Sequence, residues 1–272
     1  MGIEDLIRVG SYLSVLAVMA TWELLAPRRT LTAPKLCRWV GNLTIVILNT
    51  AIARMLFVGG VVAAAVMAEK RGWGLLNWIN APAWVELALA VLALDLIIYV
   101  QHQVFHAVPI LWRFHMMHHS DLDLDVSSGV RFHPVEIIIS MMVKIMAVLA
   151  LGAAPLAVVV FEIVLNGMAL FSHSNVKLPV GAEPILRWFV VTPDMHRIHH
   201  STNPRETNSN YGFNVPWWDR LFGTYCAEPV LGQVGMKIGL EHLGPPVCLN
   251  LLRMLQFPFV TKLGRYADRI EA

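Results

Sequence analysis

Long apolar runs alternate with short polar connections over the first 173 residues of this chain. A helix needs about 20 apolar residues to cross a bilayer. The pattern therefore predicts an all-α fold, an integral membrane helical bundle with about four to five membrane segments. The last two segments are short and meet at a turn, so they are expected to form either a tight hairpin or two full spans. The predicted segments are residues 6–26, 40–67, 83–105, 134–153 and 156–172.

The charges in the connections predict the orientation of the bundle. Residues 27–38 carry four Lys or Arg side chains, whereas the connection at 69–82 carries two. Loops rich in Lys and Arg stay in the cytoplasm, so residues 27–38 are expected there. Counting the crossings then places residues 102–133, and everything after 173, on the same cytoplasmic side.

Ten of the eleven histidines lie between positions 102 and 200, and their spacing repeats. His102 and His106 are four residues apart, and an H-x-x-H-H motif occurs twice, at 115–119 and at 196–200. On a helix, residues at i, i+3 and i+4 share one face. Pro109 separates the pair from the first motif and predicts a break between two helices. Neutral imidazole is a common metal ligand, so the pattern predicts a metal site on the predicted cytoplasmic side. The three motifs contain His102, His106, His115, His118, His119, His196, His199 and His200.

Other metal sites fit the sequence less well. No cysteine lies near the histidines, and the H-E-x-x-H motif of zinc proteases is absent because position 103 is Gln and position 197 is Arg. A calcium loop starting at Asp121 fails, because its sixth and twelfth positions are Val126 and Phe132. One metal takes about four to six ligands, so this many imidazoles predict two sites. The further candidate ligands are His173 and His133, the candidates to orient ligand imidazoles are Asp194 and Asp219, and His242 is isolated and expected to take no part.

Composition agrees with a membrane protein and excludes other classes. The chain is 56% apolar and 15% charged, and its net charge is +2. No basic run suggests a nucleic-acid partner. The three cysteines are odd in number and have no motif spacing, so no disulfide framework is expected.

The residues between 95 and 225 resemble the fatty acid hydroxylase/sterol desaturase superfamily. The matching pieces are DLIIYVQHQVFH, WRFHMMHHS, RFHPVE, HSN, TPDMHRIHHS, NYGFN and WDRLFGTY. The resemblance implies a helical membrane fold with a cytoplasmic histidine-rich helical cap. It further implies a diiron centre of two iron ions held mainly by histidine, with O2 as co-substrate. The implied reaction is hydroxylation or desaturation of a C–H bond in a lipid such as a fatty acyl chain, sterol or isoprenoid.

The resemblance also suggests how the chain is divided and what it works with. Residues 1–82 are expected to form N-terminal membrane helices and 83–230 the catalytic domain. Residues 231–272 are expected to form a tail associated with the membrane surface through the apolar stretch 247–260. The expected partners are the bilayer, a lipid substrate and an external electron donor such as ferredoxin, cytochrome b5 or a reductase.

Two other functions use the same imidazoles. A zinc-dependent membrane hydrolase would bind zinc and act without O2. A metal-binding or transport protein would place its ligands near the middle of the bilayer or at both faces, whereas these histidines are expected at one face.

Two ion pairs are expected within the membrane, where an unpaired charge is costly. Arg54 and Asp95 lie at comparable depth in the second and third predicted spans. Lys144 and Glu162 lie at one level of the predicted hairpin, before and after its turn.

Overall fold

The computed structural model describes residues 3–79, 81–240 and 251–260. Within these ranges there is no β-strand, and the only β-type contacts are two isolated bridges, Pro27 with Val176 and Ser201 with Ile238. The remaining regular structure is helical. The predicted all-α class is therefore confirmed.

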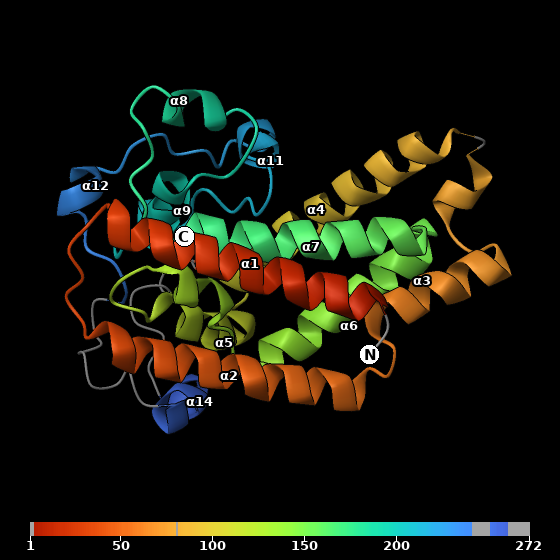
Figure 1. The fold of residues 1–272 in the computed structure, drawn as a ribbon, viewed down its shortest axis with the longest axis horizontal. Coiled ribbons are helices and arrows are strands. Elements are labelled where there is room, and N and C mark those ends of the chain that lie inside the picture. The colour runs from red at the N-terminus through yellow and green to blue at the C-terminus, as the bar shows by residue number, and fades with distance from the viewer. Residues whose placement is uncertain (1–2, 80, 241–250, 261–272) are drawn as a thin grey trace.

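The long helices lie side by side and run along one direction (Figure 1). Four stretches of the described chain are long and apolar enough to cross a membrane, namely Lys35–Trp78, Ala83–Ala107, Pro134–Leu151 and Pro155–His173. The predicted first segment, 6–26, is helical but is not among these four. The protein is thus a helical membrane protein. Its long helices are α1 (Ile3–Leu25), α2 (Lys35–Leu56), α4 (Ala83–Ala107), α6 (Pro134–Leu151) and α7 (Pro155–His173).

The predicted span over 40–67 lies within the stretch Lys35–Trp78, but it is not one continuous helix. Helix α2 ends at Leu56, and a separate helix, α3 (Gly60–Arg71), follows after a break. The break contains Gly59 and Gly60, which both have positive φ angles of 76° and 61°. Only glycine adopts such angles without strain, so this glycine pair ends the helix. Since α3 has only 12 residues, it is too short to cross a bilayer by itself.

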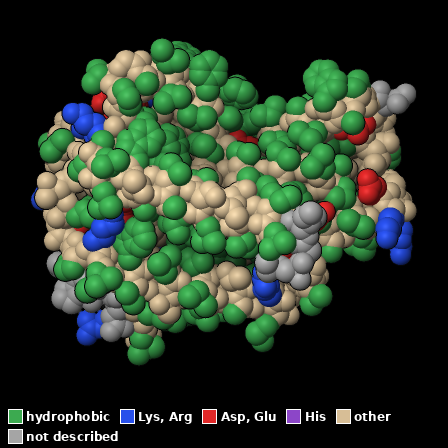
Figure 2. Space-filling model, in the orientation of Figure 1, with side chains coloured by type: hydrophobic (Ala, Val, Ile, Leu, Met, Phe, Trp, Pro, Cys, Tyr) green, Lys and Arg blue, Asp and Glu red, His purple; other side chains and the backbone are tan. Residues whose placement is uncertain are grey.

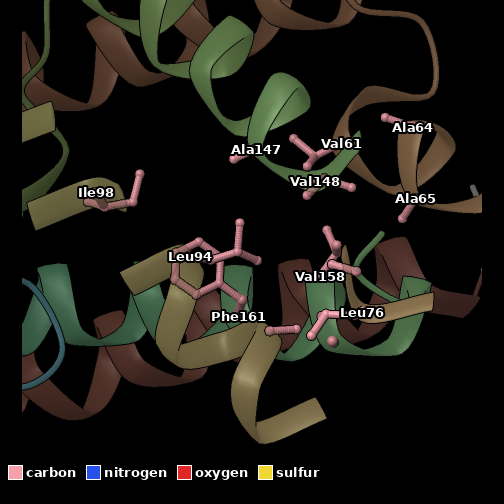
Figure 3. Packing of buried hydrophobic residues seen from close by; sticks show 13 residues of the cluster. Val61, Ala64, Ala65, Leu76, Leu94, Ile98, Ala147, Val148, Val158 and Phe161 are labelled. Atoms are coloured by element: carbon pink, nitrogen blue, oxygen red, sulfur yellow. The ribbon is translucent and has the colours of Figure 1, made fainter. Parts of the chain in front are cut away.

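The end of the bundle that carries α3 is built on close apolar packing. Helices α3, α4, α6 and α7 share a core that includes Val61, Leu94, Val148 and Phe161 (Figure 3). The short helix η1 (Leu75–Trp78) follows α3 and packs on α6.

The short helices gather at the opposite end of the bundle and form a cap (Figure 1). Thr192 caps helix α9 by accepting a hydrogen bond from the Met195 backbone, and Pro193 occupies the first turn of this helix. The predicted break at Pro109 is confirmed. The cap helices are α5 (Pro109–His119), η2 (Val126–Val130), α8 (Glu183–Leu186), α9 (Pro193–His199), α10 (Pro204–Thr207), α11 (Trp217–Leu221) and α12 (Gly232–Gly235).

The last described helix, α14 (Leu251–Val260), packs one side against the cap and exposes the other. Its Met254 and Phe257 side chains are buried in a cluster with Trp112 of α5, whereas Leu252 and Phe259 are exposed. Residues 247–250 of the predicted surface stretch lie outside the described residues. The association of this tail with the membrane surface, and the domain limits at 82 and 230, remain predictions.

One of the two expected ion pairs forms. Lys144 Nζ lies 3.4 Å from Glu162 Oε1, and Arg8 Nη2 of α1 lies 2.5 Å from the other carboxylate oxygen. The Arg54–Asp95 pair was predicted wrongly. Arg54 is exposed near the end of α2, which is shorter than the predicted span, and Asp95 instead accepts a hydrogen bond of 2.8 Å from Trp218 Nε1.

Helix α2 is joined to the cap through a buried arginine. Arg38 is 1% exposed and donates from Nε to Asp121 Oδ1 at 2.8 Å and from Nη1 to Asp125 Oδ2 at 2.6 Å. It also donates to the Asp123 carbonyl at 2.5 Å. This explains the acidic run of residues 121–125, which the sequence already distinguished from a calcium loop. The aspartates neutralise a buried cation and hold the loop before η2 in place.

Candidate metal centre

Nine of the ten candidate histidines come together in two neighbouring groups. They are delivered by the end of α4, by α5, by the end of α7 and by α9 with the residue after it. Within each group, one ligand nitrogen from every histidine lies within 4.8 Å of the others. The first group contains His102, His106, His115, His119 and His199, and the second contains His118, His173, His196 and His200.

Each H-x-x-H-H motif is shared between the two groups. In α5, His115 and His119 belong to the first group and His118 to the second. In the second motif the assignment is reversed, because His199 belongs to the first group while His196 and His200 belong to the second. The i+3 histidine of each motif therefore crosses to the other group. The groups touch where the rings of His119 and His200 stack with centroids 4.4 Å apart.

The distances between the ring nitrogens fit metal ligation. In the first group, His115 Nε2 lies 3.1 Å from His102 Nε2 and 3.2 Å from His119 Nε2. In the second, His173 Nε2 lies 3.1 Å from His118 Nε2 and 3.0 Å from His196 Nε2. Two imidazole nitrogens that bind one ion at about 2.1 Å and at right angles lie about 3.0 Å apart. The side chains are therefore already spaced as ligands of a shared ion.

The opposite ring nitrogens are held by acceptors, which fixes the tautomer. A carbonyl oxygen can only accept a hydrogen bond, so the Nδ1 atom that faces it carries the proton and Nε2 keeps its lone pair. Metal-binding histidines are typically oriented in this way. The Nδ1 partners are the carbonyl oxygens of Tyr211 for His102 (2.8 Å), Arg131 for His118 (3.2 Å), Ala169 for His173 (2.8 Å) and Ser209 for His199 (2.8 Å).

His115 differs from these four because its Nδ1 faces a carboxylate. Glu136 Oε1, in the first turn of α6, lies 2.7 Å from His115 Nδ1. The Glu136 side chain is buried, and its second oxygen has no hydrogen-bond partner among the described residues. A carboxylate behind a ligand imidazole makes that imidazole a stronger donor to the metal. In the sequence, Glu136 stands only as the last residue of RFHPVE, with no spacing that relates it to His115.

A short loop after α10 supplies two of the carbonyl acceptors. Asn210 adopts a left-handed conformation with φ 50°, and its side chain bonds to the Met195 carbonyl and to both backbone groups of Cys226. Asp219 accepts hydrogen bonds of 2.8 Å from the Tyr211 and Gly212 backbone amides. Asp219, a candidate to orient imidazoles, therefore acts on His102 through this loop and not by direct contact.

Five histidines of the cap are buried where the charged form of the ring is disfavoured. Burial, followed by the charge that neighbouring imidazoles would carry, lowers the pKa of His118, His119, His196 and His200 well below its usual range. Burial also lowers the pKa of His199 to about 3. These rings are therefore neutral at physiological pH, which is the form that binds metal.

Not all candidates belong to the two groups. His133 lies outside both of them, because its Nδ1 accepts the Val135 amide and caps α6 while its Nε2 lies 3.2 Å from the Leu255 carbonyl. Asp194 binds Arg28 and Arg197 and contacts no ligand ring. His242 lies outside the described residues. The arrangement thus offers five imidazoles to one ion and four to a second.

Gly129 of η2 permits the close approach of α7 behind His173. A Cβ atom at this position would lie 2.5 Å from the Ala169 carbonyl oxygen and 3.3 Å from His173 Nδ1. We expect Gly129→Ala to displace this acceptor and to lower metal binding in the second group about tenfold or more, because it disturbs an outer partner of a ligand. Metal titration of the purified protein measures the effect.

Gly181→Ala is the matched control, since a Cβ atom there meets nothing within 4 Å. It should bind metal as the unchanged protein does. Equal metal binding in both variants would contradict the role of this close packing.

Comparison with known proteins places this site in a family context. The model of the family described as fatty acid hydroxylase matches residues 87–224. This region contains all nine grouped histidines, and also His133 and Glu136. No solved structure matches the chain.

The curated relatives match between about half and two thirds of this chain. An ornithine lipid hydroxylase, OlsE, of Rhizobium tropici is 33% identical over 149 residues, covering 54% of this chain and 44% of its own length. An alkylglycerol monooxygenase of Xenopus tropicalis is 31% identical, covering 61% of this chain and 35% of its own length. A fatty acid hydroxylase, vlmA, of Lecanicillium sp is 28% identical over 63% of this chain and 52% of its own length. The chain thus spans about a third to a half of the length of the relatives it matches.

Proposed function

This chain belongs to the fatty acid hydroxylase family, and from that premise we propose that it is a membrane-bound, O2-dependent oxygenase that hydroxylates or desaturates a C–H bond of a lipid. The observation that carries the proposal is the pair of all-histidine groups at the ends of apolar helices. The named activities of the relatives, on ornithine lipid, alkylglycerol and fatty acid, support a lipid substrate.

The two groups fit two iron ions. Their donors are neutral imidazoles alone, and imidazole suits iron as well as zinc, copper and nickel. Five imidazoles would hold one ion and four would hold the other, which is fewer than the six ligands that iron can take. When bound, the irons supply O2 activation and the abstraction of hydrogen from a lipid carbon.

The protein's own residues position these ions and limit access to them. Eight of the nine imidazoles are buried, and only His106 is half-buried. The ring of His106 packs against Trp112 and Tyr211, with centroids 4.7 Å and 5.1 Å away. Both ring nitrogens of His106 are nevertheless buried. A rigid, buried surround allows one C–H bond to reach the centre and excludes bulk water.

The proposal also covers the side of the membrane on which the site lies and the source of its electrons. The excess of Lys and Arg in residues 27–38 supports a cytoplasmic location for the site. Electrons come from an external donor such as ferredoxin, cytochrome b5 or a reductase. The gathering of all nine ligands at one end of the bundle favours an oxygenase over a transporter, whose ligands would lie near mid-membrane or at both faces.

Metal analysis combined with an O2 assay tests this function. The protein purified from iron-replete cells should contain about two irons per chain, one for each group of four to six ligands. Supplied with a reduced donor and total membrane lipid, it should incorporate one atom of labelled O2 into a lipid or remove two hydrogens from it. Zinc-loaded protein with hydrolytic turnover under argon, and no oxidised lipid in air, would overturn the proposal.

A further inference from the structure

The cap carries an exposed cluster of large apolar side chains that no part of the described chain covers. It lies on α8 with the residues after it and on α11. Six side chains with exposed fractions of 42% to 69% form this aromatic patch: Ile185, Trp188, Phe189, Trp217, Leu221 and Phe222. Figure 2 shows hydrophobic side chains over this upper edge of the molecule. Contiguous apolar surface of this kind usually marks an interaction site.

The two segments that make the patch are fixed to each other. Trp217 Nε1 donates a hydrogen bond of 2.7 Å to the Trp188 carbonyl. The guanidinium of Arg220 lies 4.0 Å from the ring centroids of both Trp188 and Tyr225, and it donates to the Arg187 carbonyl at 3.1 Å. The patch is therefore one preformed surface of aromatic rings around a cation. Tryptophan, tyrosine and arginine are the residues that anchor proteins at the boundary between lipid and water.

The position of α11 relative to α4 shows what this surface faces. Phe222 stacks on Tyr99 of α4 with ring centroids 5.6 Å apart, and Tyr99 Oη lies 2.8 Å from Thr224 Oγ1. Further along α4, Asp95 accepts the hydrogen bond from Trp218. At 1.5 Å per residue, Tyr99 and Asp95 lie about 12 and 18 Å before the end of this helix at Ala107. Because α4 is about 38 Å long and the hydrocarbon core is about 30 Å thick, α11 lies at the depth of the bilayer and not beyond it.

The outer surface of α4 near these contacts is apolar as well. Val100 and Val104, on the same part of that helix, are 45% and 41% exposed. In Figure 1, α11 lies between α8 and the end of α4. Apolar side chains are thus exposed both on α4 and on the segment that packs against it.

We propose that the aromatic patch is immersed in the lipid–water interface of the bilayer and holds the cap against the leaflet on the side of the metal centre. The rings of Trp188, Trp217 and Phe222 contact lipid at the acyl boundary, and Arg220 stays bound to the Trp188 and Tyr225 rings and the Arg187 carbonyl. The patch would thereby keep the metal centre at the surface from which a lipid enters. The proposal rests on the membrane-spanning helices and does not depend on the proposed activity.

Spin labelling of the full chain in lipid bilayers tests this placement. Single cysteines are introduced at Leu221 and Ile185 in a variant whose native cysteines are replaced by alanine, and collision with O2 is compared with collision with a water-soluble nickel chelate. O2 concentrates in lipid and the chelate in water. Labels at both positions should have a several-fold higher ratio of O2 to chelate accessibility than a label at Val234.

Val234 and Val100 provide the two matched controls. Val234 is 66% exposed and lies on α12, which is at the far edge of the cap in Figure 1. Val100 on α4 should give the lipid-exposed result. A Leu221 label as accessible to the chelate as the Val234 label would overturn the proposal. Strong spin–spin coupling between Leu221 labels would overturn it too, because a second copy of the chain would then cover the patch.

Discussion

Alanine in place of His173 should remove metal from the second histidine group and abolish lipid oxidation, while the protein stays in the membrane. His173 Nε2 lies 3.0 Å from His196 Nε2 and 3.1 Å from His118 Nε2, at the centre of a group of four. Loss of one of four ligands leaves three, below the usual number for a bound ion. Iron analysis should show about half of the unchanged content, and product formation should fall below detection.

His133→Ala is the matched control for this experiment. It is the same substitution in the same region, but His133 caps α6 and contacts neither group. We expect full iron content, turnover close to that of the unchanged protein, and a loss of stability of about 1 kcal/mol from the missing cap. Loss of iron in His133→Ala, or full iron and activity in His173→Ala, would contradict the assignment of the nine ligands.

Replacement of Glu136 by glutamine should weaken the first group without changing its ligands. The substitution keeps the shape of the side chain but removes the negative charge that lies 2.7 Å from His115 Nδ1. Loss of such an outer partner costs about 10- to 100-fold in metal affinity or activity. We expect kcat to fall in this range while KM for the lipid changes little, because the carboxylate contacts the ligand and not the substrate.

Competition with an iron chelator measures the affinity directly. Glu69→Gln, which changes an exposed glutamate at the far end of the bundle, is the control and should leave affinity and kcat unchanged. If Glu136→Gln bound iron as tightly as the control and had the same kcat, the carboxylate would have no influence on the centre.

The long helices and the convergence of the histidines could be predicted from the sequence because both depend on local features, namely the length of the apolar runs and the spacing of the histidines. Apolar runs long enough to cross a bilayer can form few structures other than helices. Residues at i, i+3 and i+4 must share a face, so His115, His118 and His119 had to point in similar directions. The break within the predicted span over 40–67 was missed because the apolar pattern outweighed the local signal of Gly59 and Gly60.

The assignment of each histidine to its group could not be predicted, because it depends on how α5 and α9 pack. Spacing shows that the three rings of a motif are neighbours but does not show that His118 and His199 each join the other motif's group. His133 illustrates the same limit, since a histidine before a proline at a helix start is equally consistent with a cap. Glu136 acts on a residue 21 positions away in the sequence, and no local pattern connects the two.

The buried Arg38 has a consequence for the order in which the protein assembles. Its partner Asp121 lies 83 residues later in the chain. At a synthesis rate of about 5 to 20 residues per second, Arg38 is added to the chain about 4 to 17 s before Asp121 is. Helix α2 must therefore enter the membrane while its arginine is still bound to water or lipid phosphate. The cap can close only after α4 and α5 have been made, so the centre forms as a late event of biosynthesis.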